Sequence, residues 1–383
     1  MRFPGPKDVF HFITKPRVRY APLIEVRIFR DRLLHNLRVH QDANPRLAFA
    51  PVLKSNAYGH GLIEVARVME AASVPFLVVD SFYEALKCRQ HSVRTPILVI
   101  GYSTAEQWNQ AKVRDCSFTI VSTDHLRAIA SGLARPQKFH LKIDTGMCRQ
   151  GILPGEINSA VHLIKQSPHI SVEGACSHFS DADGADEMFT MKQIAAWNAA
   201  AAELKKEFPG IRYLHIAATP GLRWSRRVHA NVCRLGMGLY GMNPLRGEKL
   251  PLAPALRMTA KISGVKTVPA GSKIGYGRTA TASREMRLVT IPAGYFEGVD
   301  RRLSNKGAVK VRGKFLPIAG RVSMNITTAD ATSLPDVRLE EEAILISEDP
   351  ADQNSIERIA GICGTIPYDI AVRIPPHLRR IMV

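Results

Sequence analysis

The sequence has no long apolar segment. None of its apolar runs approaches the roughly 20 residues that a helix needs to cross a bilayer. The first twenty residues are charged and contain proline, and they lack the apolar core of a secretory signal peptide. We therefore expect a protein with no membrane partner and a cytoplasmic location.

Cysteine is scarce and scattered. The chain contains six cysteines, and it has neither a Cys-x-x-Cys pair nor a cluster of histidine and cysteine at the spacing of a zinc site. This pattern gives no support for a metal site and predicts reduced thiols, most of them in the core. The six are Cys88, Cys116, Cys148, Cys176, Cys233 and Cys363.

Acidic residues are outnumbered by basic ones. The chain has 34 Asp and Glu against 52 Lys and Arg, which gives a formal net charge of +18. A positive field of this size attracts nucleic acid, acidic lipid and anionic metabolites. The basic residues are dispersed, however, and their short clusters, such as 223–227 and 301–302, accompany no recognised nucleic-acid-binding motif. We therefore predict a solvated basic surface and no nucleic-acid partner.

Short apolar runs alternate with helix-like stretches through the first two thirds of the chain. Eight candidate strands in this rhythm predict an α/β fold, a TIM (β/α)8 barrel over residues 31–245, with its chemistry at the carboxyl ends of the strands. The candidate strands are residues 47–53, 76–79, 97–100, 118–121, 139–143, 172–176, 214–217 and a last one ending at Arg234. The helical patterns cover residues 64–72, 84–90, 104–113, 123–130 and 185–208.

The pattern changes after Gly241. Prolines at 244, 251 and 254 mark a connection, and β-branched runs then alternate with Gly and Pro turns. We predict a second, mostly β carboxy-terminal domain over residues 246–383. Its candidate strands are 288–292, 308–311, 315–318 and 343–346, with one helix near 355–362.

Lys54 follows directly after the apolar segment 47–53, where the chain turns toward a helix that begins near Leu62. A lysine in this position can be partly withdrawn from water, which frees its amine to form a Schiff base with an aldehyde cofactor. Pyridoxal 5'-phosphate is the obvious candidate. An isolated lysine here would more often be a solvated strand-end residue, so the interpretation depends on its neighbours.

The block Lys54-Ser55-Asn56-Ala57-Tyr58-Gly59-His60-Gly61 resembles the pyridoxal-phosphate attachment motif of alanine racemases. Further blocks match the same family in the same order, at 141–151, 177–180, 234–241 and 274–279. The resemblance implies a fold type III isomerase that interconverts L- and D-alanine through a pyridoxal-phosphate aldimine and supplies D-alanine for cell-wall peptidoglycan. It also implies that residues 1–30 join the carboxy-terminal domain.

The resemblance assigns two catalytic residues. A racemase must remove and replace the α-proton of an amino acid, so it needs an acid or base on each face of a planar intermediate. Lys54 matches the lysine of one face. Tyr276, between Gly275 and Gly277, matches a tyrosine that the partner subunit contributes to the other face, which implies a homodimer with composite active sites. Without the family match, a tyrosine between glycines is more often a turn residue.

Cofactor contacts are implied in the same way. Arg234 matches the arginine that donates to the pyridine nitrogen, and His178 matches the histidine that connects this arginine to the tyrosine. Unaided, the two residues could equally be a surface ion-pair arginine and a histidine at the edge of the core. The cofactor phosphate is expected at the ends of the last two barrel strands. The residues expected around the phosphate are Tyr58, Thr219, Gly236, Met237 and Tyr368.

Substrate contacts are also implied by the match. Arg149 looks like the arginine that contacts the substrate carboxylate, for which a guanidinium fork is well suited. Lys142 matches a lysine that is carbamylated in many members and then orients that arginine. Met324 resembles the methionine whose backbone contacts the carboxylate across the dimer. Tyr295 matches a tyrosine at the entrance, where a small pocket favours alanine.

Several positions depart from the family pattern. Asn325 stands where Asp is usual, Ala218-Thr219 replaces Asn-Ser, and Phe296-Glu297 replaces Ala-Asp. Arg27 stands where an acidic residue is usual. None of these positions belongs to the expected acid/base pair, so we expect them to affect substrate preference and turnover rather than the type of reaction.

Other functions are open at this point. One is a racemase of broader specificity, acting on serine or basic amino acids, and another is a related pyridoxal-phosphate barrel that decarboxylates basic amino acids. A non-catalytic carrier of the cofactor is a third alternative. The first two predict different products from their amino-acid substrates, and the carrier predicts bound cofactor without any reaction.

Overall fold

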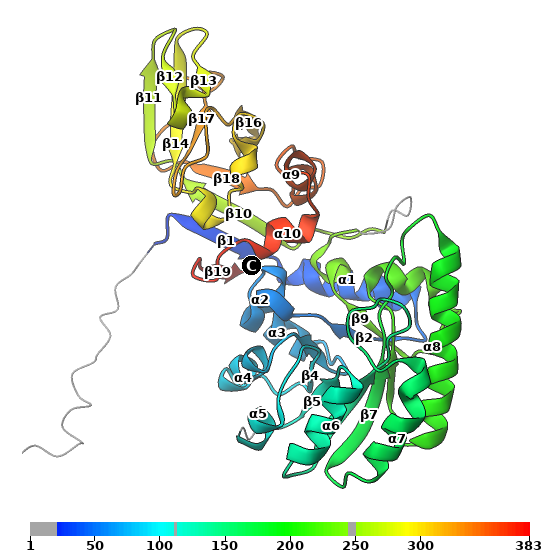
Figure 1. Cartoon of the computed structure of the whole chain (residues 1–383). Coiled ribbons are helices and arrows are strands. Elements are labelled where there is room, and N and C mark those ends of the chain that lie inside the picture. The colour runs from blue at the N-terminus through cyan, green and yellow to red at the C-terminus, as the bar shows by residue number, and fades with distance from the viewer. Residues whose placement is uncertain (1–20, 111–112, 244–249) are drawn as a thin grey trace, which may run out of the picture.

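The computed structural model describes residues 21–110, 113–243 and 250–383. Figure 1 shows two parts, a barrel surrounded by helices and a strand-rich part that extends away from it. No helix in the described ranges is long and apolar enough to span a membrane. The fold class predicted from the sequence is confirmed.

Eight parallel strands form the barrel. Six of them pair in chain order from β3 to β8, and β2 pairs with β9. Single bridges from Val52 to Val78 and from Ala218 to Arg234 connect these two groups, so the strands form a continuous ring. The strands are β2 Ala48–Pro51, β3 Leu77–Val79, β4 Ile97–Val99, β5 Cys116–Ile120, β6 Gln137–Lys142, β7 Ile170–Cys176, β8 Tyr213–His215 and β9 Val232–Leu235. All eight candidate strands of the barrel are confirmed.

Helices surround the barrel (Figure 1). They are α1 Arg30–Ala43, α3 Leu62–Ala71, α4 Phe82–Gln90, α5 Ala105–Gln110, α6 Thr123–Gly132, α7 Ile157–Lys165 and α8 Glu187–Glu207. The five predicted helices are confirmed, although the expected 104–113 stretch includes residues 111–112, which lie outside the described residues. Local signals fix some starts: Ser81 and Glu84 form a capping box at α4. The predictions did not include α1 and α7.

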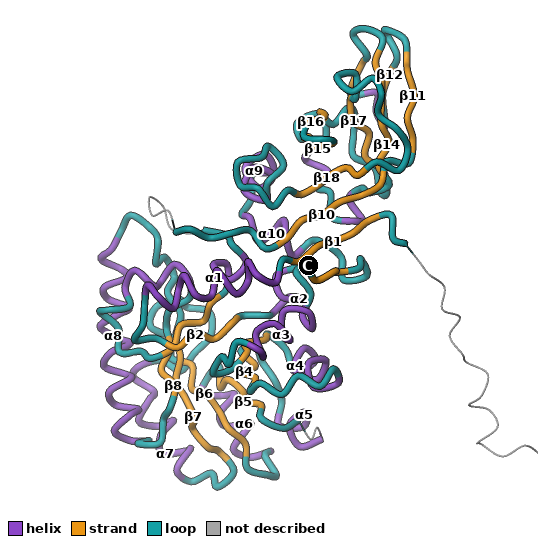
Figure 2. The backbone as a smooth tube through the Cα atoms, turned by 180° about the vertical axis from the view of Figure 1, so that it is seen from behind, coloured by secondary structure: helices purple, strands orange, loops and turns teal. Residues whose placement is uncertain are grey.

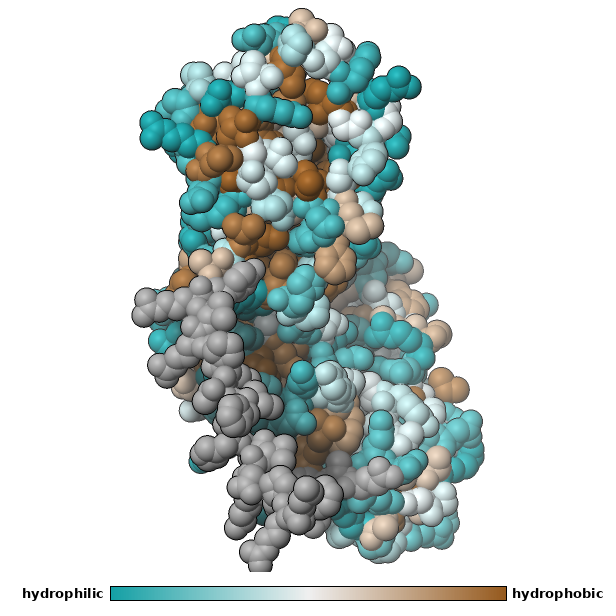
Figure 3. All heavy atoms as spheres, turned by 90° about the vertical axis from the view of Figure 1, so that its left-hand side faces the viewer, coloured by the Kyte–Doolittle hydropathy of each residue, from teal (hydrophilic) through white to brown (hydrophobic). Residues whose placement is uncertain are grey.

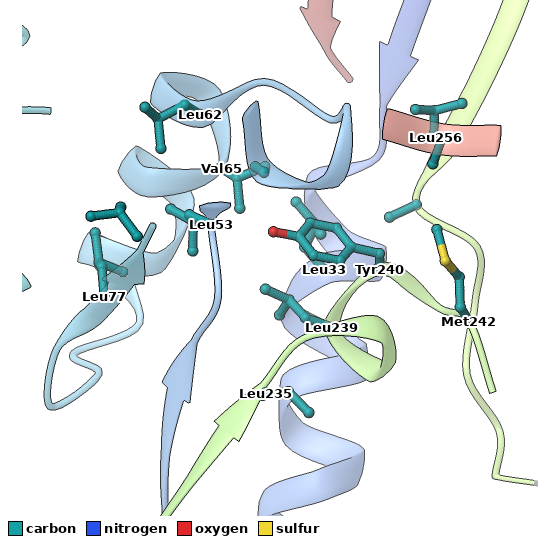
Figure 4. Packing of buried hydrophobic residues seen from close by; sticks show 14 of the residues in the cluster. Leu33, Leu53, Leu62, Val65, Leu77, Leu235, Leu239, Tyr240, Met242 and Leu256 are labelled. Carbon is teal, nitrogen blue, oxygen red and sulfur yellow. The ribbon is translucent and has the colours of Figure 1, made fainter. Parts of the chain in front are cut away.

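The apolar faces of strands and helices meet in a continuous core. Figure 4 shows Leu53 and Leu77 from the barrel strands and their ends packed with Val65 of α3. Tyr240 enters the same core from the opposite side, and its hydroxyl donates to the carbonyl of Val52 across 2.7 Å. Because Val52 lies just before Lys54, this bond fixes the end of β2 beside the site.

The second part contains two sheets and a hairpin. A six-stranded sheet has the order β16-β15-β18-β10-β1-β19, a three-stranded sheet has the order β11-β14-β17, and β12 pairs with β13. The strands are β1 Ile24–Ile28, β10 Leu256–Lys261, β11 Gly264–Val268, β12 Lys273–Ile274, β13 Ala280–Thr281, β14 Met286–Ile291, β15 Ala308–Val311, β16 Lys314–Pro317, β17 Thr327–Asp330, β18 Glu342–Ile346 and β19 Arg380–Met382. Two helices accompany them, α9 Ile356–Cys363 and α10 Pro367–Val372. The four predicted strands and the predicted helix are confirmed.

The strand β1 is far from most of its sheet in sequence but lies inside the sheet, next to the edge strand β19. It lies between β10 and β19, pairing antiparallel with the first and parallel with the second (Figure 2). The domain limits expected from the sequence, 31–245 for the barrel and 246–383 with 1–30 for the β-rich part, stay a prediction.

The two parts meet at α2 Lys54–Tyr58, the turn that carries the lysine. Arg380 donates from Nε and Nη2 to the carbonyl of Gly59, at 3.1 and 2.9 Å. A Cβ atom at Gly59 would lie 2.0 Å from the carbonyl oxygen of Ala371 in α10. Glycine is therefore needed where the β-rich part approaches this turn.

Candidate active site

The lysine lies on a left-handed turn. Ser55, Asn56, Ala57 and Tyr58 have φ angles between 52° and 56°. Each non-glycine residue in this conformation costs about 1–2 kcal/mol, so surrounding contacts must hold the turn. One such contact is the backbone N–H of Leu62, which donates to Oδ1 of Asn56 across 2.9 Å.

The turn opens into a cavity of about 830 Å³ at the carboxyl ends of the barrel strands. Most of the residues predicted for cofactor and substrate line this one cavity, although they come from distant segments of the chain. They are Lys54, Tyr58, Arg149, His178, Thr219, Arg234, Gly236, Met237 and Tyr368. Lys142 lies near this cavity but is not among its lining residues.

Arg234 is the centre of a buried network. Its side chain, on β9, is only 6% exposed. Nη1 donates to Nδ1 and to the carbonyl of His215, at 2.6 and 2.9 Å. Nη2 donates to the carbonyls of Ser177 and Ile216 and to Nδ1 of His178, at 2.7, 2.9 and 2.9 Å. Within the described residues no acceptor is found for its Nε–H, which leaves this donor for a group in the cavity.

His178 accepts from the guanidinium, so its Nδ1 is the unprotonated nitrogen and the ring is neutral. Burial and the charge of Arg234 lower its pKa from 6.5 to about 3. A neutral ring with Nδ1 occupied keeps its proton on Nε2, where it can be donated.

The network continues into the barrel through residues that sequence reasoning missed. Nε2 of His215 and Nδ1 of His140 are 2.8 Å apart, and Nε2 of His140 is 3.8 Å from Oε2 of Glu173. Partial burial would raise the pKa of Glu173, but hydrogen bonds from His140, Ser117 and Lys138 outweigh it and lower that pKa to about 2. His140 lies two residues before Lys142 and points to the barrel interior; strand alternation was the one signal that could have identified it.

The other end of the cavity contains phenols and a hydroxyl. The rings of Tyr58 and Tyr368 lie 6.3 Å apart in an edge-on arrangement. Burial, followed by the proximity of Tyr368, raises the pKa of Tyr58 to about 12, so its hydroxyl stays a hydrogen-bond donor. A Cβ atom at Gly236 would lie 2.9 Å from this hydroxyl. Thr219 begins a 3-10 helix at Thr219–Trp224, and its Oγ1 accepts from the N–H of Gly238 at 3.3 Å.

The exposed Arg149 follows a tightly held turn. Oδ1 of Asp144 accepts from the backbone N–H groups of Gly146, Met147 and Cys148, at 2.9, 2.9 and 3.1 Å. Lys142 donates from Nζ to Oε1 of Gln150 across 3.2 Å. Desolvation lowers the pKa of Lys142, which increases the fraction of its amine that is uncharged and nucleophilic.

Three predicted residues lie elsewhere. Tyr276, Tyr295 and Met324 line a second cavity of about 810 Å³ in the β-rich part, and Lys54 is not among the residues that line it. Tyr276 is 71% exposed and Met324 56% exposed. In Figure 3, hydrophobic residues (brown) are visible among hydrophilic ones on the surface of the β-rich part, at the top of the view. A single chain therefore does not bring Tyr276 and Lys54 into one cavity.

Within the described residues, neither the cysteines nor a cluster of possible metal ligands adds a site to these two cavities. Five of the six cysteines are buried and only Cys148 is exposed, and each is a free thiol, as predicted. No group of three or more His, Cys, Asp or Glu in the described residues is placed to hold a metal ion.

The chain matches known families over almost its full length. Residues 28–244 match the family described as "Alanine racemase, N-terminal domain", and residues 255–382 match "Alanine racemase, C-terminal domain". The chain is 37% identical over 345 residues to an alanine racemase of Syntrophobacter fumaroxidans, covering 88% of this chain and 92% of the relative. It is 35% identical to an alanine racemase of Lactiplantibacillus plantarum, covering 87% and 90%.

Solved structures agree with these relatives. The fold is similar to an alanine racemase of Clostridium difficile with a TM-score of 0.88 at 27% identity, covering 95% of this chain and 97% of the other. It is also similar to the Bacillus anthracis alanine racemase with bound L-Ala-P, with a TM-score of 0.86 at 28% identity and coverage of 95% and 96%.

Proposed function

The chain belongs to the alanine racemase family, an isomerase family that interconverts L- and D-alanine, and from this premise we propose how its own residues carry out the reaction. One observation carries the proposal: Lys54, His178 and Arg234, which come from three different strand ends, line one cavity. The D-alanine would supply cell-wall peptidoglycan. The cytoplasmic location stays a prediction.

Pyridoxal 5'-phosphate is the cofactor that fits this cavity. Lys54 would hold its aldehyde, and the Nε–H of Arg234 would donate to its ring nitrogen. Tyr58, Thr219 and Tyr368 supply hydroxyl groups for a phosphate, and the missing side chain at Gly236 leaves space beside the hydroxyl of Tyr58. When bound, the cofactor supplies the electron sink that makes the α-proton of an amino acid removable.

Two residues would move the proton. The amine of Lys54 would take or return it on one face of the α-carbon, and the phenol of Tyr276 of the partner subunit would do so on the other. Nε2 of the neutral His178 would donate to that phenol oxygen and stabilise its ionised form. Arginine resists deprotonation, so Arg234 would leave the ring nitrogen unprotonated and moderate the electron sink.

The substrate would be held by its carboxylate and limited by its side chain. The guanidinium of Arg149 and the backbone of Met324 of the partner subunit would bind the carboxylate. Lys142, once carbamylated, would orient Arg149. Tyr295 of the partner subunit would restrict the entrance to small side chains such as the methyl group of alanine.

A homodimer with composite active sites follows from this assignment. Tyr276, Tyr295 and Met324 lie on one cavity of the chain, and Lys54 lies on another. Two chains related by a two-fold axis would bring each cavity of one against the complementary cavity of the other. The domain limits 31–245 and 246–383 with 1–30 would then separate the cofactor-holding part from the part that serves the partner.

Racemisation in deuterated water tests this function. The purified protein, loaded with pyridoxal 5'-phosphate, is expected to exchange the α-proton of L- and D-alanine and to produce the other enantiomer. Faster exchange with serine or lysine than with alanine would favour the broad-specificity alternative. Release of carbon dioxide from ornithine or lysine would favour the decarboxylase, and bound cofactor without exchange would favour a carrier.

A further inference from the structure

Two loops on the second cavity are joined by hydrogen bonds. The 3-10 turn Tyr295–Glu297 lies against the loop 323–326. The backbone N–H of Tyr295 donates to the carbonyl of Ser323 across 3.0 Å, and that of Phe296 donates to the carbonyl of Met324 across 2.9 Å. The carbonyl of Met324 and the position of Tyr295 are thereby fixed together.

A side-chain pair closes the same contact. Nδ2 of Asn325 donates to Oε1 of Glu297 across 2.7 Å, and the N–H of Gly294 donates to Oε2 across 2.8 Å. Both carboxylate oxygens are therefore occupied. Glu297 is only 7% exposed, and no Lys or Arg in the described ranges lies within ion-pair distance of it. A buried carboxylate held only by amide donors depends strongly on each of them.

The backbone leaves little room for the loops to adjust. A Cβ atom at Gly294 would lie 2.2 Å from the carbonyl oxygen of Ser323. Thr327, just after the second loop, donates from Oγ1 to the carbonyl of Ala293 across 2.7 Å. The two loops are therefore closely coupled, and a repulsion introduced at the Glu297–Asn325 pair would be transmitted to Tyr295 and Met324.

We propose that Glu297 and Asn325 are positioning residues, a matched carboxylate–amide pair that holds Tyr295 and Met324 in place for the substrate. The pair unites two of the departures from the family pattern: a glutamate long enough to reach residue 325 meets an amide that donates to it. An aspartate at 325 would instead place a second carboxylate beside Glu297. The inference rests on the proposed function, because Tyr295 and Met324 act in the site of the partner subunit.

Exchange of the pair tests the inference in the full-length protein loaded with pyridoxal 5'-phosphate. Asn325→Asp is expected to raise the KM for alanine about tenfold or more, because repulsion between the two carboxylates would displace the residues that place the substrate. A tenfold change corresponds to about 1.4 kcal/mol of binding free energy. We expect kcat to stay within about threefold. Asn158→Asp makes the same charge change on the exposed surface of α7 and is the matched control.

The reciprocal variant Glu297→Gln/Asn325→Asp again places one amide opposite one carboxylate, with the two groups exchanged. The amide oxygen of the glutamine introduced at position 297 would accept from Gly294, and its amide nitrogen would donate to the new carboxylate at position 325. We expect KM to return to within about threefold of that of the unmodified protein. A KM unchanged in Asn325→Asp, or no recovery in the reciprocal variant, would overturn the inference.

Hybrid dimers separate this inference from the function on which it rests. The first hybrid pairs a Lys54→Ala chain with an Asn325→Asp chain and is isolated through two affinity tags. Its one working site combines Lys54 of the Asn325→Asp chain with the unmodified loops of the Lys54→Ala chain. This hybrid is expected to show the KM of the unmodified protein. When both changes are on one chain and the other chain is unmodified, the working site has altered loops and KM is expected to rise. Equal KM values in the two hybrids would overturn the inference.

Failure of the proposed function would give a different result from failure of the inference about Glu297 and Asn325. The unmodified protein would then not racemise alanine at all, and urea unfolding of the same variants would still measure the pair. Loss of stability in Asn325→Asp and its recovery in the reciprocal variant support the pairing. Additive effects contradict it.

Discussion

Arg234 donates from Nη2 to Nδ1 of His178 across 2.9 Å. This bond fixes the tautomer of the histidine, because a nitrogen that accepts from a guanidinium cannot itself carry a proton. Burial and the neighbouring charge lower the pKa of His178 to about 3, so it stays neutral throughout the physiological range. The site thus contains one fixed cation and one neutral donor side by side.

Replacement of Arg234 by lysine is expected to destabilise the protein by about 3 kcal/mol, despite the retained charge. One ammonium group cannot reach both the acceptors of Nη1 on His215 and the acceptors of Nη2 on Ser177, Ile216 and His178. Urea unfolding measures the loss. Arg127→Lys, at an exposed ion pair with Asp124, is the control and is expected to change stability by less than about 0.5 kcal/mol. An equal loss of stability at the two positions would contradict the role assigned to the guanidinium group of Arg234.

The left-handed turn predicts an inverted order of alanine and glycine. Asn56→Ala and Asn56→Gly both lose the bond from Leu62, but only alanine is strained at a φ of 55°. We therefore expect Asn56→Ala to be less stable than Asn56→Gly by about 1 kcal/mol. At the exposed helical position Lys192 of α8 the order should be the usual one, with alanine more stable by about 1 kcal/mol. The same order at both positions would show that the turn is not left-handed in solution.

Buried histidines make stability depend on pH. Desolvation lowers the pKa of His40 from 6.5 to about 4, so below pH 6.5 the unfolded chain takes up a proton that the folded chain does not bind. The free energy of unfolding therefore decreases as pH falls from 6.5 to about 4, by about 1.4 kcal/mol per pH unit for this group. Urea unfolding between pH 7.5 and 4.5 should show a shallower decrease in His40→Gln. The exposed His162→Gln is the control, and an identical change of slope in both variants would refute the assignment to burial.

The glycine beside Tyr58 predicts a loss of cofactor affinity. Gly236→Ala would place a Cβ atom 2.9 Å from the hydroxyl of Tyr58 and force the ring to move. We expect the Kd for pyridoxal 5'-phosphate, measured by absorbance titration, to rise about tenfold. Gly155→Ala, where a Cβ atom meets no other atom within 4 Å, should leave the Kd unchanged. An unchanged Kd in Gly236→Ala would mean that the cofactor does not use this end of the cavity.

The sequence predicted those parts of the fold that local patterns determine. The eight barrel strands are short buried runs, and their order along the chain dictates a parallel ring. The helix α1 was missed because two of its four buried residues, Asn36 and His40, are polar and weaken the apolar pattern. The strand β10 was missed because it falls just after the prolines that suggested only a connection.

The candidate site likewise contains residues that local motifs predict and contacts that they do not predict. Motifs identified Lys54, Tyr58 and Arg234, because these residues lie in contiguous blocks of the sequence, and all three line the first cavity. Contacts between distant residues could not be predicted. The pair of Glu297 with Asn325 joins positions 28 residues apart, and the contact between His140 and His215 joins positions 75 apart. Such contacts depend on how strands and loops are placed in space.

Complementation between two inactive chains is the most direct test of the central claim, that Lys54 and Tyr276 of different subunits form one site. Lys54→Ala and Tyr276→Phe chains are each expected to form dimers with almost no racemase activity. When the chains are mixed in equal amounts and allowed to exchange subunits, half of the dimers become hybrids with one intact site of two, so activity should recover to about a quarter of that of the unmodified protein. No recovery, with hybrid formation verified through affinity tags, would contradict the claim.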